Sequence, residues 1–348
     1  MNMDLDALAT SYGIITDDVL NDDGSSPLSN STKASLLQAL GVDPATAGPG
    51  DFDPASRPKQ RCALPDQLQG RRCWGVTCQL YALRSASSMG IGDFDDLGRL
   101  AEVCAAAGAS FLGVNPLHAI FFADPSRTSP YSPSSRRFLN PLYIAVHRID
   151  SEQRSNADVV AGGQEPDPEA LEAELVDYAA VSRLKHIRLR ARFSELKGSL
   201  TKDAGFQSFR EKGGGGLRNF ALFEALSFHM HEGRGAAGWH GWPEEFQSRH
   251  SPEVRDFEDV NETEIEFHEW LQYVADAQLR QAHERALAAG MSIGLYLDLA
   301  VGVAPDGAET WADPELVVRG VRVGAPPDLF NADGQDWGLA PLSPRVLE

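Results

Sequence analysis

The chain has 348 residues, 42% of them hydrophobic, and a formal net charge of −19 at pH 7. That length is enough to bury a sizeable core and to form more than one domain. Nucleic acids and anionic membranes bind through clustered Lys and Arg, so the acidic balance argues against both partners, whereas a neutral ligand such as a sugar is unaffected by it.

The N-terminal stretch MNMDLDALATSYGI lacks a basic region followed by an apolar run, and no stretch approaches the roughly 20 apolar residues of a membrane-spanning helix. We therefore expect a cytoplasmic protein. The four cysteines (Cys62, Cys73, Cys78 and Cys104) lack the paired spacing of a zinc site, so we expect ordinary reduced thiols and no metal.

Residues 1 to about 47 carry two short helical patterns, DLDALATSYGI and STKASLLQALGV. Ser31 or Thr32 is predicted to cap the second helix and Gly41 to end it. The following stretch, PATAGPGDFDPASRP, is dense in Pro, Gly, Asp and Ser and is typical of a linker. We therefore divide the chain into residues 1–60, a helical segment with its linker, and residues 61–348.

From Trp74 onward the pattern changes to strand, helix and strand. WGVTCQLYAL alternates apolar side chains over strand length, the next apolar residues recur at helical spacing up to Gly108, and FLGVNPL follows as a second strand. Two strands with one helix between them have the size of a βαβ unit, which predicts that the strands pair in parallel.

A third strand, SIGLYLDLAVGV at 292–303, comes only after an excursion that is too long for one crossover, so we place an insertion at about residues 150–265. Its first part, SEQRSNADVVAGGQEPDPE, has the composition of a surface loop, and its later parts are helical. The run GGGG at 213–216 indicates a hinge or loop and, without a preceding strand, does not qualify as a phosphate-binding loop.

Two α/β architectures fit this pattern, an open doubly wound sheet and a closed (β/α)8 barrel. The turn after the first strand contains Gly90 and Gly92 but lacks the third glycine of a dinucleotide fingerprint, so a nucleotide site is not expected. The loop NPLHAIFFADPSRTSPYSPSSRRFLNPLYIAV supplies aromatic, guanidinium and amide groups of the kind that bind sugars. The alternative is a proline-stiffened surface loop whose aromatic side chains merely pack.

Four segments, WGVTCQLYALRSASSMGIGDFDDL, SPYSPSSRRFLNPLYI, GLYLDLAVGVAPDGAETW and GAPPDLFNADGQDWGL, resemble 4-alpha-glucanotransferases (amylomaltases) and occur in the same order. They cover residues 74–144 and 270–342. The resemblance implies a (β/α)8 TIM barrel, of which this chain would form an incomplete part with about the first three strands, a helical insertion and a small N-terminal helical appendage. It also implies retaining, double-displacement transfer of α-1,4-glucan segments between maltooligosaccharides, or to glucose or maltose, without a cofactor.

Carried over position by position, the resemblance implies sugar-binding roles. Tyr131 resembles the family tyrosine that stacks on or hydrogen-bonds to a sugar in the donor site. Asp298, at the end of the third strand, matches a barrel-strand aspartate that supports the site and contacts sugar, with a helix cap or loop acid as the alternative. Asp328 and Trp337 fall in a loop that resembles the family's flexible cover over the substrate groove, Trp337 being the stronger candidate for a sugar contact.

Two more residues of the proline-rich loop are candidates for substrate binding. His118, in NPLHA, is expected either to contact a sugar or to be a satisfied structural histidine. Asn140 is included as well, although we expect it to brace the loop rather than to touch substrate.

Retaining transfer needs two carboxyl groups roughly 5 to 5.5 Å apart. The resemblance places the nucleophile in an Arg-Ile-Asp-His segment and the acid/base in a Glu-Asp-Leu segment, both after the GQDWGL loop, so we expect both beyond residue 348 and expect this chain to be an inactive, truncated form. Arg148, Ile149 and Asp150 match the nucleophile segment but lack its histidine and precede the third strand, so Asp150 is not assigned that role. The alternative function is a non-catalytic glucan-binding or regulatory module.

Overall fold

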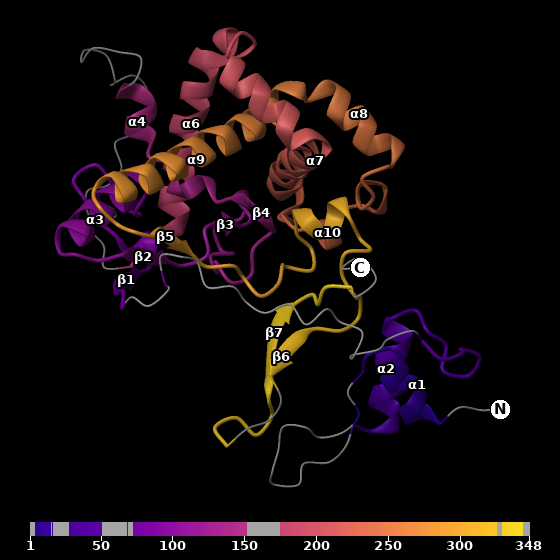
Figure 1. Ribbon diagram of the computed structural model, residues 1–348. Helices are drawn as coiled ribbons and strands as arrows, with labels where there is room; N and C mark the ends of the chain where they lie inside the picture. Colours follow the sequence, from indigo (N-terminus) through magenta and orange to yellow (C-terminus); the bar gives the residue numbers. More distant parts are fainter. Residues whose placement is uncertain are drawn as a thin grey trace. The chain divides into compact units, whose positions relative to one another are not determined.

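A computed structural model of the chain describes residues 4–14, 16, 28–50, 68, 72–151, 175–325 and 329–343 (Figure 1). Its α-helices are α1 (Leu5–Ser11), α2 (Asn30–Ala39), α3 (Phe94–Ala106), α4 (Val146–Ser151), α6 (Tyr178–Leu200), α7 (Ala204–Arg234), α8 (Pro252–Val260), α9 (Glu262–Ala288) and α10 (Ala308–Ala312). Its strands are β1 (Gly75–Cys78), β2 (Phe111–Val114), β3 (His118–Ala119), β4 (Ser135–Leu139), β5 (Gly294–Leu297), β6 (Val323–Ala325) and β7 (Gln335–Leu339).

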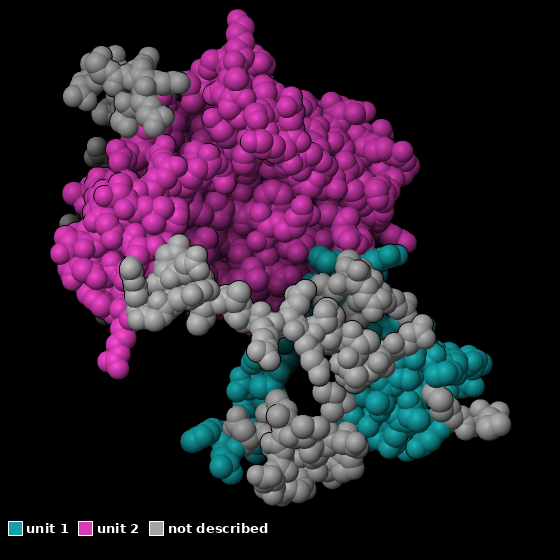
Figure 2. Space-filling view, in the orientation of Figure 1, with its two compact units in different colours: residues 1–65, 315–348 teal, residues 66–314 magenta. Residues whose placement is uncertain are grey.

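The chain forms two compact units, residues 1–65 with 315–348 and residues 66–314 (Figure 2). The larger unit contains every strand of the parallel sheet and the helical insertion. Among the described residues no helix combines the length and the apolar character that crossing a membrane requires.

The larger unit is built on a parallel sheet with strand order β1-β2-β5. Gly75 pairs with Phe111 at the start of the β1–β2 ladder, and Phe111 pairs in turn with Gly294 of β5. The parallel pairing predicted for the first two strands is confirmed. Helices α3 and α9 pack against each other and bury Leu97, Leu112 and their neighbours in one apolar core, which covers the sheet.

Helix α3 is specified by its own sequence. The Asp93 carboxylate accepts hydrogen bonds from the backbone N–H groups of Asp95 and Asp96 at 2.9 and 3.1 Å, and the Asp96 carboxylate accepts one from the Asp93 N–H, which completes a capping box. The helix ends at Ala106, and Gly108 follows with a φ of 90°, a left-handed conformation that suits glycine. The predicted end at Gly108 is therefore confirmed.

The first strand is shorter than predicted. β1 ends at Cys78, and the residues Leu80–Ala82 form the 3-10 turn η2. The reason is a tertiary contact: the Leu80 N–H donates to the side-chain oxygen of Asn115 at 2.7 Å instead of to a neighbouring strand. An alternating sequence pattern does not reveal that a distant side chain, rather than a neighbouring strand, accepts from the Leu80 N–H.

A buried carboxylate joins three helices of the larger unit. Asp95, on α3, is 1% exposed in its side chain and lies 2.7 Å from Arg99, 2.9 Å from Arg148 on α4 and 2.8 Å from Arg285 on α9. Burial favours the neutral acid, but the hydrogen bond from His147 and the nearby guanidinium groups hold the pKa of Asp95 below its ordinary value. Arg148, which begins the Arg-Ile-Asp sequence, therefore has a structural partner in Asp95 of α3.

The glycine run 213–216 lies inside the span of α7, where Gly214 adopts a φ of 47° and a ψ of −142°. The expected hinge or loop is thus a kink between two helical stretches. The C-terminal part of α7 carries a second apolar core, in which Phe223 stacks on Trp242 with ring centroids 5.1 Å apart and also contacts Trp311.

In the smaller unit, α1 and α2 share a small core that includes Leu8 and Leu37. Ser29 caps α2, accepting a hydrogen bond from the Thr32 N–H at 3.1 Å, so the predicted cap at Ser31 or Thr32 is wrong. The helical backbone begins at Asn30, which makes the next two polar residues part of the first turn.

The segment that was expected to be a loop over the substrate groove contains an antiparallel pair, β6 and β7. Gly334 adopts a φ of 71° directly before β7, a conformation that glycine adopts without steric cost. Trp337 lies within β7 rather than in a loop, because its backbone belongs to this hairpin.

Lys185, on α6, is fully buried. Its ammonium group donates to the carbonyl oxygens of Leu142 at 2.6 Å and Ile144 at 2.9 Å, which ties the insertion to the chain that follows β4. Burial lowers the pKa of Lys185 from 10.5 to about 8, against the opposing attraction of Asp93 and Asp96.

We predict a pH-dependent stability from Lys185. The unfolded chain holds this proton more tightly than the folded chain, so the free energy of unfolding contributed by Lys185 rises as the pH rises from about 8 towards 10.5. Lys185→Met removes the titrating group. The difference in thermal midpoint, wild type minus variant, should therefore increase by a few degrees between pH values of about 7.5 and about 9.5, as measured by calorimetry. A constant difference over this range would contradict the prediction.

Candidate functional site

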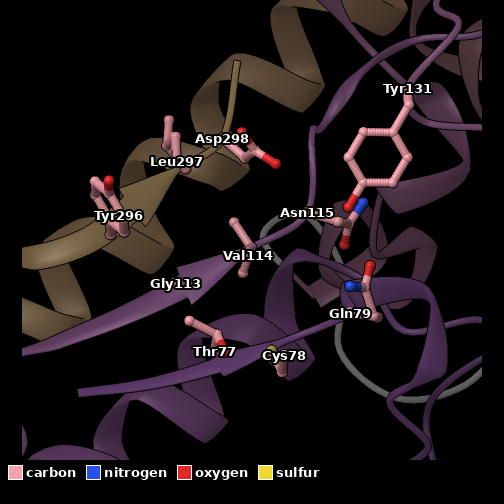
Figure 3. A pocket seen from close by; sticks show the side chains of 10 residues that line it. All are labelled: Thr77, Cys78, Gln79, Gly113, Val114, Asn115, Tyr131, Tyr296, Leu297 and Asp298. Carbon is pink, nitrogen blue, oxygen red and sulfur yellow. The ribbon is translucent and has the colours of Figure 1, made fainter. Parts of the chain in front are cut away.

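A cavity of about 330 Å³ lies at the carboxyl ends of the three parallel strands (Figure 3). Residues 77–79 from the end of β1, 113–115 from β2 and 296–298 from β5 line it, and Tyr131 joins them from the loop between β3 and β4. Parallel strands present all their carboxyl ends at one edge of the sheet, and this edge is where α/β proteins build their sites.

Asn115 forms the link between two of these strand ends. It is 3% exposed; its side-chain oxygen accepts from the Leu80 N–H at 2.7 Å, and its amide nitrogen donates to the Pro116 carbonyl at 2.9 Å and to the Tyr143 hydroxyl at 3.2 Å. Burial raises the pKa of Tyr143, which keeps that hydroxyl neutral. Sequence reasoning missed Asn115, although an amide directly after a barrel strand was a usable signal.

Tyr131 and Asp298 are the two sequence-predicted residues that the structure brings together. Both line the cavity, Tyr131 is 50% exposed, and Asp298 directly follows the last residue of β5. In Figure 3 the Asp298 carboxylate extends from the end of β5 towards the side on which the Tyr131 ring lies. The cavity therefore offers an aromatic face and a carboxylate at one mouth.

The rest of the cavity lining carries no charge and mixes polar side chains with apolar ones such as Val114. Thr77 and Gln79 are exposed and supply a hydroxyl and an amide. Cys78 is half-buried, and burial raises the pKa of its thiol. Asp298 is the one carboxylate among the described residues that line the cavity, so this lining does not contain the pair of carboxyl groups that retaining transfer requires.

His118 lies on β3 and does not line the cavity. Its Nε2 accepts a hydrogen bond from the Ala300 N–H at 3.3 Å. Burial, and then the neighbouring Arg136 guanidinium, lower the pKa of His118, which favours the neutral ring that this bond requires.

Asn140 is also outside the cavity lining. It is 3% exposed, its side chain accepts from the Leu142 N–H at 3.0 Å, and its own N–H donates to the Leu117 carbonyl at 2.9 Å. The side-chain bond caps the 3-10 turn η3 (Pro141–Tyr143), and the backbone bond ties Asn140 to the chain before β3.

Of the two candidates in the C-terminal segment, the structure describes Trp337, which belongs to the smaller unit. Trp337 is 45% exposed, and its indole N–H donates to the Gln335 side chain at 3.0 Å. Asp328 lies outside the described residues.

The predicted proline-rich loop was expected either to supply aromatic groups for a sugar site or to hold aromatic side chains that merely pack. Its aromatic residues divide between a cavity position and packing positions. Phe138 stacks on Phe220 with ring centroids 4.2 Å apart, and Tyr143 is 2% exposed within the main core, so both are packing residues. Tyr131 alone of these three lines the cavity. Within the described part of the chain, no group of three or more His, Cys, Asp or Glu residues could hold a metal ion.

Comparisons with known proteins are consistent with one another. A sequence model of a family described as 4-alpha-glucanotransferase matches residues 78–348. The 4-alpha-glucanotransferase of Mycobacterium tuberculosis is 39% identical over 295 residues, covering 82% of this chain and 40% of that protein. The Haemophilus influenzae 4-alpha-glucanotransferase is 35% identical over 298 residues, covering 82% of this chain and 42% of that protein.

Among solved structures, amylomaltase from Corynebacterium glutamicum matches with a TM-score of 0.59 and 34% identity, covering 81% of this chain and 38% of that one. This similarity supports an α/β fold like that of a TIM barrel. The chain spans about 40% of the length of the curated relatives named above.

We predict that the hydrogen bonds of Asn115 stabilise the strand ends that form the cavity. Asn115→Ala leaves the buried Leu80 N–H and the Tyr143 hydroxyl without their partner, which should cost about 1 to 3 kcal/mol and lower the thermal midpoint. Gln79→Ala, which truncates an exposed lining residue, is the matched control and should melt like the wild type. Equal melting of the two variants by circular dichroism would show that the Asn115 bonds contribute nothing.

Proposed function

Because the chain belongs to the 4-alpha-glucanotransferase family, we propose that this protein transfers α-1,4-glucan segments between maltooligosaccharides, or to glucose or maltose as acceptor, by a retaining double displacement. The observation that supports this proposal most directly is the cavity at the carboxyl ends of β1, β2 and β5, with Tyr131 and Asp298 at its mouth. Its position in the fold is the one at which barrel enzymes bind their substrates.

Within this mechanism we assign the described cavity a binding role. The flat ring of Tyr131 suits the apolar face of a glucose unit, and the Asp298 carboxylate is able to accept hydrogen bonds from two sugar hydroxyls. Thr77 and Gln79 offer further hydroxyl and amide groups. A neutral glucan has no charge for the acidic protein to repel, which is consistent with the net charge of −19.

The chemical step needs groups beyond this lining. One carboxylate has to attack the anomeric carbon and form a glycosyl-enzyme, while a second protonates the departing oxygen and later deprotonates the acceptor hydroxyl. Asp298 is a single carboxylate, so we propose that it orients the sugar and that the nucleophile and the acid/base are not among the described residues of the cavity. Transfer of this kind uses carboxyl groups and no cofactor.

We predict weak, specific binding of maltoheptaose, detectable as saturation transfer from protein to sugar protons by NMR. Tyr131→Ala and Asp298→Asn should each weaken binding roughly tenfold or more, because a stacked ring or a charged hydrogen bond contributes about 1.5 kcal/mol or more. Asp259→Asn and Val260→Ala, exposed substitutions on α8, are the matched controls. Saturation transfer that persists unchanged in both cavity variants would place the sugar elsewhere.

A second function, a non-catalytic glucan-binding or regulatory module, is favoured by the single carboxylate in the cavity lining. Incubation with maltotriose separates the two, because a glucanotransferase converts it to glucose and longer oligosaccharides. The proposed transfer predicts that glucose and longer oligosaccharides appear together. Unconverted maltotriose in a sample that binds maltoheptaose would contradict transfer and favour the binding module.

A further inference from the structure

The direction of the Asp298 side chain depends on a short segment that leaves β5 without regular structure. Residues 298–300 belong to no helix or strand, and Leu299 and Val301 are 67% and 65% exposed. Ala300 is different, because it is 2% exposed and lies inward. Local packing therefore holds this segment chiefly at Ala300, two residues beyond Asp298.

Both backbone polar groups of Ala300 are held by side chains from the β3–β4 pair. The Ala300 N–H donates to Nε2 of His118 on β3 at 3.3 Å, and its carbonyl accepts from the Arg136 guanidinium on β4 at 3.3 Å. The same guanidinium nitrogen lies 3.4 Å from the carbonyl oxygen of Val301. A buried peptide without these partners would lose about 1 to 3 kcal/mol for each unmade bond.

The same hairpin is anchored further along the chain at α10. The Glu309 carboxylate accepts from the Arg136 N–H at 2.8 Å and from the Ser135 hydroxyl at 3.2 Å, and the Ala308 N–H donates to the Ser134 hydroxyl at 2.9 Å. The pair β3–β4 therefore has a fixed position from which His118 and Arg136 reach the exit of β5.

We propose that His118 is a positioning residue for Asp298: its neutral ring accepts the Ala300 N–H and, together with Arg136, fixes the backbone that aims the carboxylate into the cavity. The importance of this for sugar binding rests on the function proposed above. The positioning itself is a property of the backbone and is measured without a sugar.

The hydrogen bond requires a lone pair on Nε2, so it exists only with the proton on Nδ1. A second proton would set two N–H groups against each other and add a positive charge beside Arg136. The charged groups that face His118 are Arg136 on β4, which disfavours protonation, and Glu309 on α10 and Asp298 after β5, which favour it. Burial and Arg136 prevail and lower the pKa of His118 below 6.5, so the bond is intact at neutral pH and is lost as the pH falls through that lowered value.

The test is hydrogen exchange of the Ala300 amide by NMR, expressed as a protection factor to remove the intrinsic dependence of exchange on pH. His118→Phe keeps an aromatic ring but has no acceptor, so the protection factor of the Ala300 amide should fall at least tenfold. His118→Gln restores an acceptor and should recover it. His240→Phe, at an exposed histidine, is the control and should leave Ala300 unchanged.

Acid titration gives a second readout that a general structural role would not change. In the wild type, protection of Ala300 should fall as the pH decreases below 6.5, whereas His118→Gln should show no such step, because an amide does not titrate. Unchanged Ala300 protection in His118→Phe, or the same acid step in His118→Gln, would overturn the proposal. If His118→Phe fails to fold, the comparison of wild type with His118→Gln decides the question.

Maltoheptaose binding then separates the two proposals. If His118 acts through Asp298, adding His118→Phe to Asp298→Asn should weaken binding no further than Asp298→Asn alone. Additive losses would overturn the positioning role. Absence of maltoheptaose binding by the wild type would count against the proposed function, while the exchange measurement would still decide the role of His118.

Discussion

The parallel pairing of β2 with β5 joins two strands that the whole helical insertion separates in the chain. Phe111 pairs with Gly294 and Val114 with Leu297, and this register places Asn115 and Asp298 side by side at the carboxyl edge. Helix α9 leads directly into β5 and packs on α3, so the same apolar core that stabilises the insertion also fixes the register. The cavity depends on this long-range ladder and would not exist without it.

Side chains, rather than further strands, satisfy the backbone where the strands end. After β1, the Asn115 side chain accepts a hydrogen bond from the Leu80 N–H. After β5, His118 accepts from the Ala300 N–H and Arg136 donates to the Ala300 carbonyl. A buried peptide group needs a partner, so each of these side chains determines where its strand stops and where the next residues point. Some polar residues around the cavity, such as Tyr131, therefore contact solvent. Others hold the backbone at the strand ends in place, and we call these residues the frame.

Membership of the 4-alpha-glucanotransferase family is consistent with this division. Under the function proposed above, retaining transfer would demand that donor and acceptor sugars be held in line with two carboxyl groups, and a misplacement of about 1 Å would be costly in rate. A rigid frame behind Asp298 suits that demand. The ion pairs of Asp95 with Arg148 and Arg285 extend the frame through α3, α4 and α9, which keeps the helical layer in register behind the sheet.

The sequence by itself determined what depends on neighbouring residues: the α3 capping box and its end at Gly108, the strand–helix–strand order, and a polar, aromatic loop after β2. Tertiary structure decided the rest. Tyr131 and Phe138 belong to the same predicted loop, but Phe138 lies on β4 and packs on Phe220, whereas Tyr131 lines the cavity. Likewise, β1 stops at Cys78 because the Asn115 side chain accepts from the Leu80 N–H. Hydrophobic periodicity indicates which face of a helix or strand is apolar. It does not identify the distant residues that pack on that face, because these residues meet only when β2 and β5 pair.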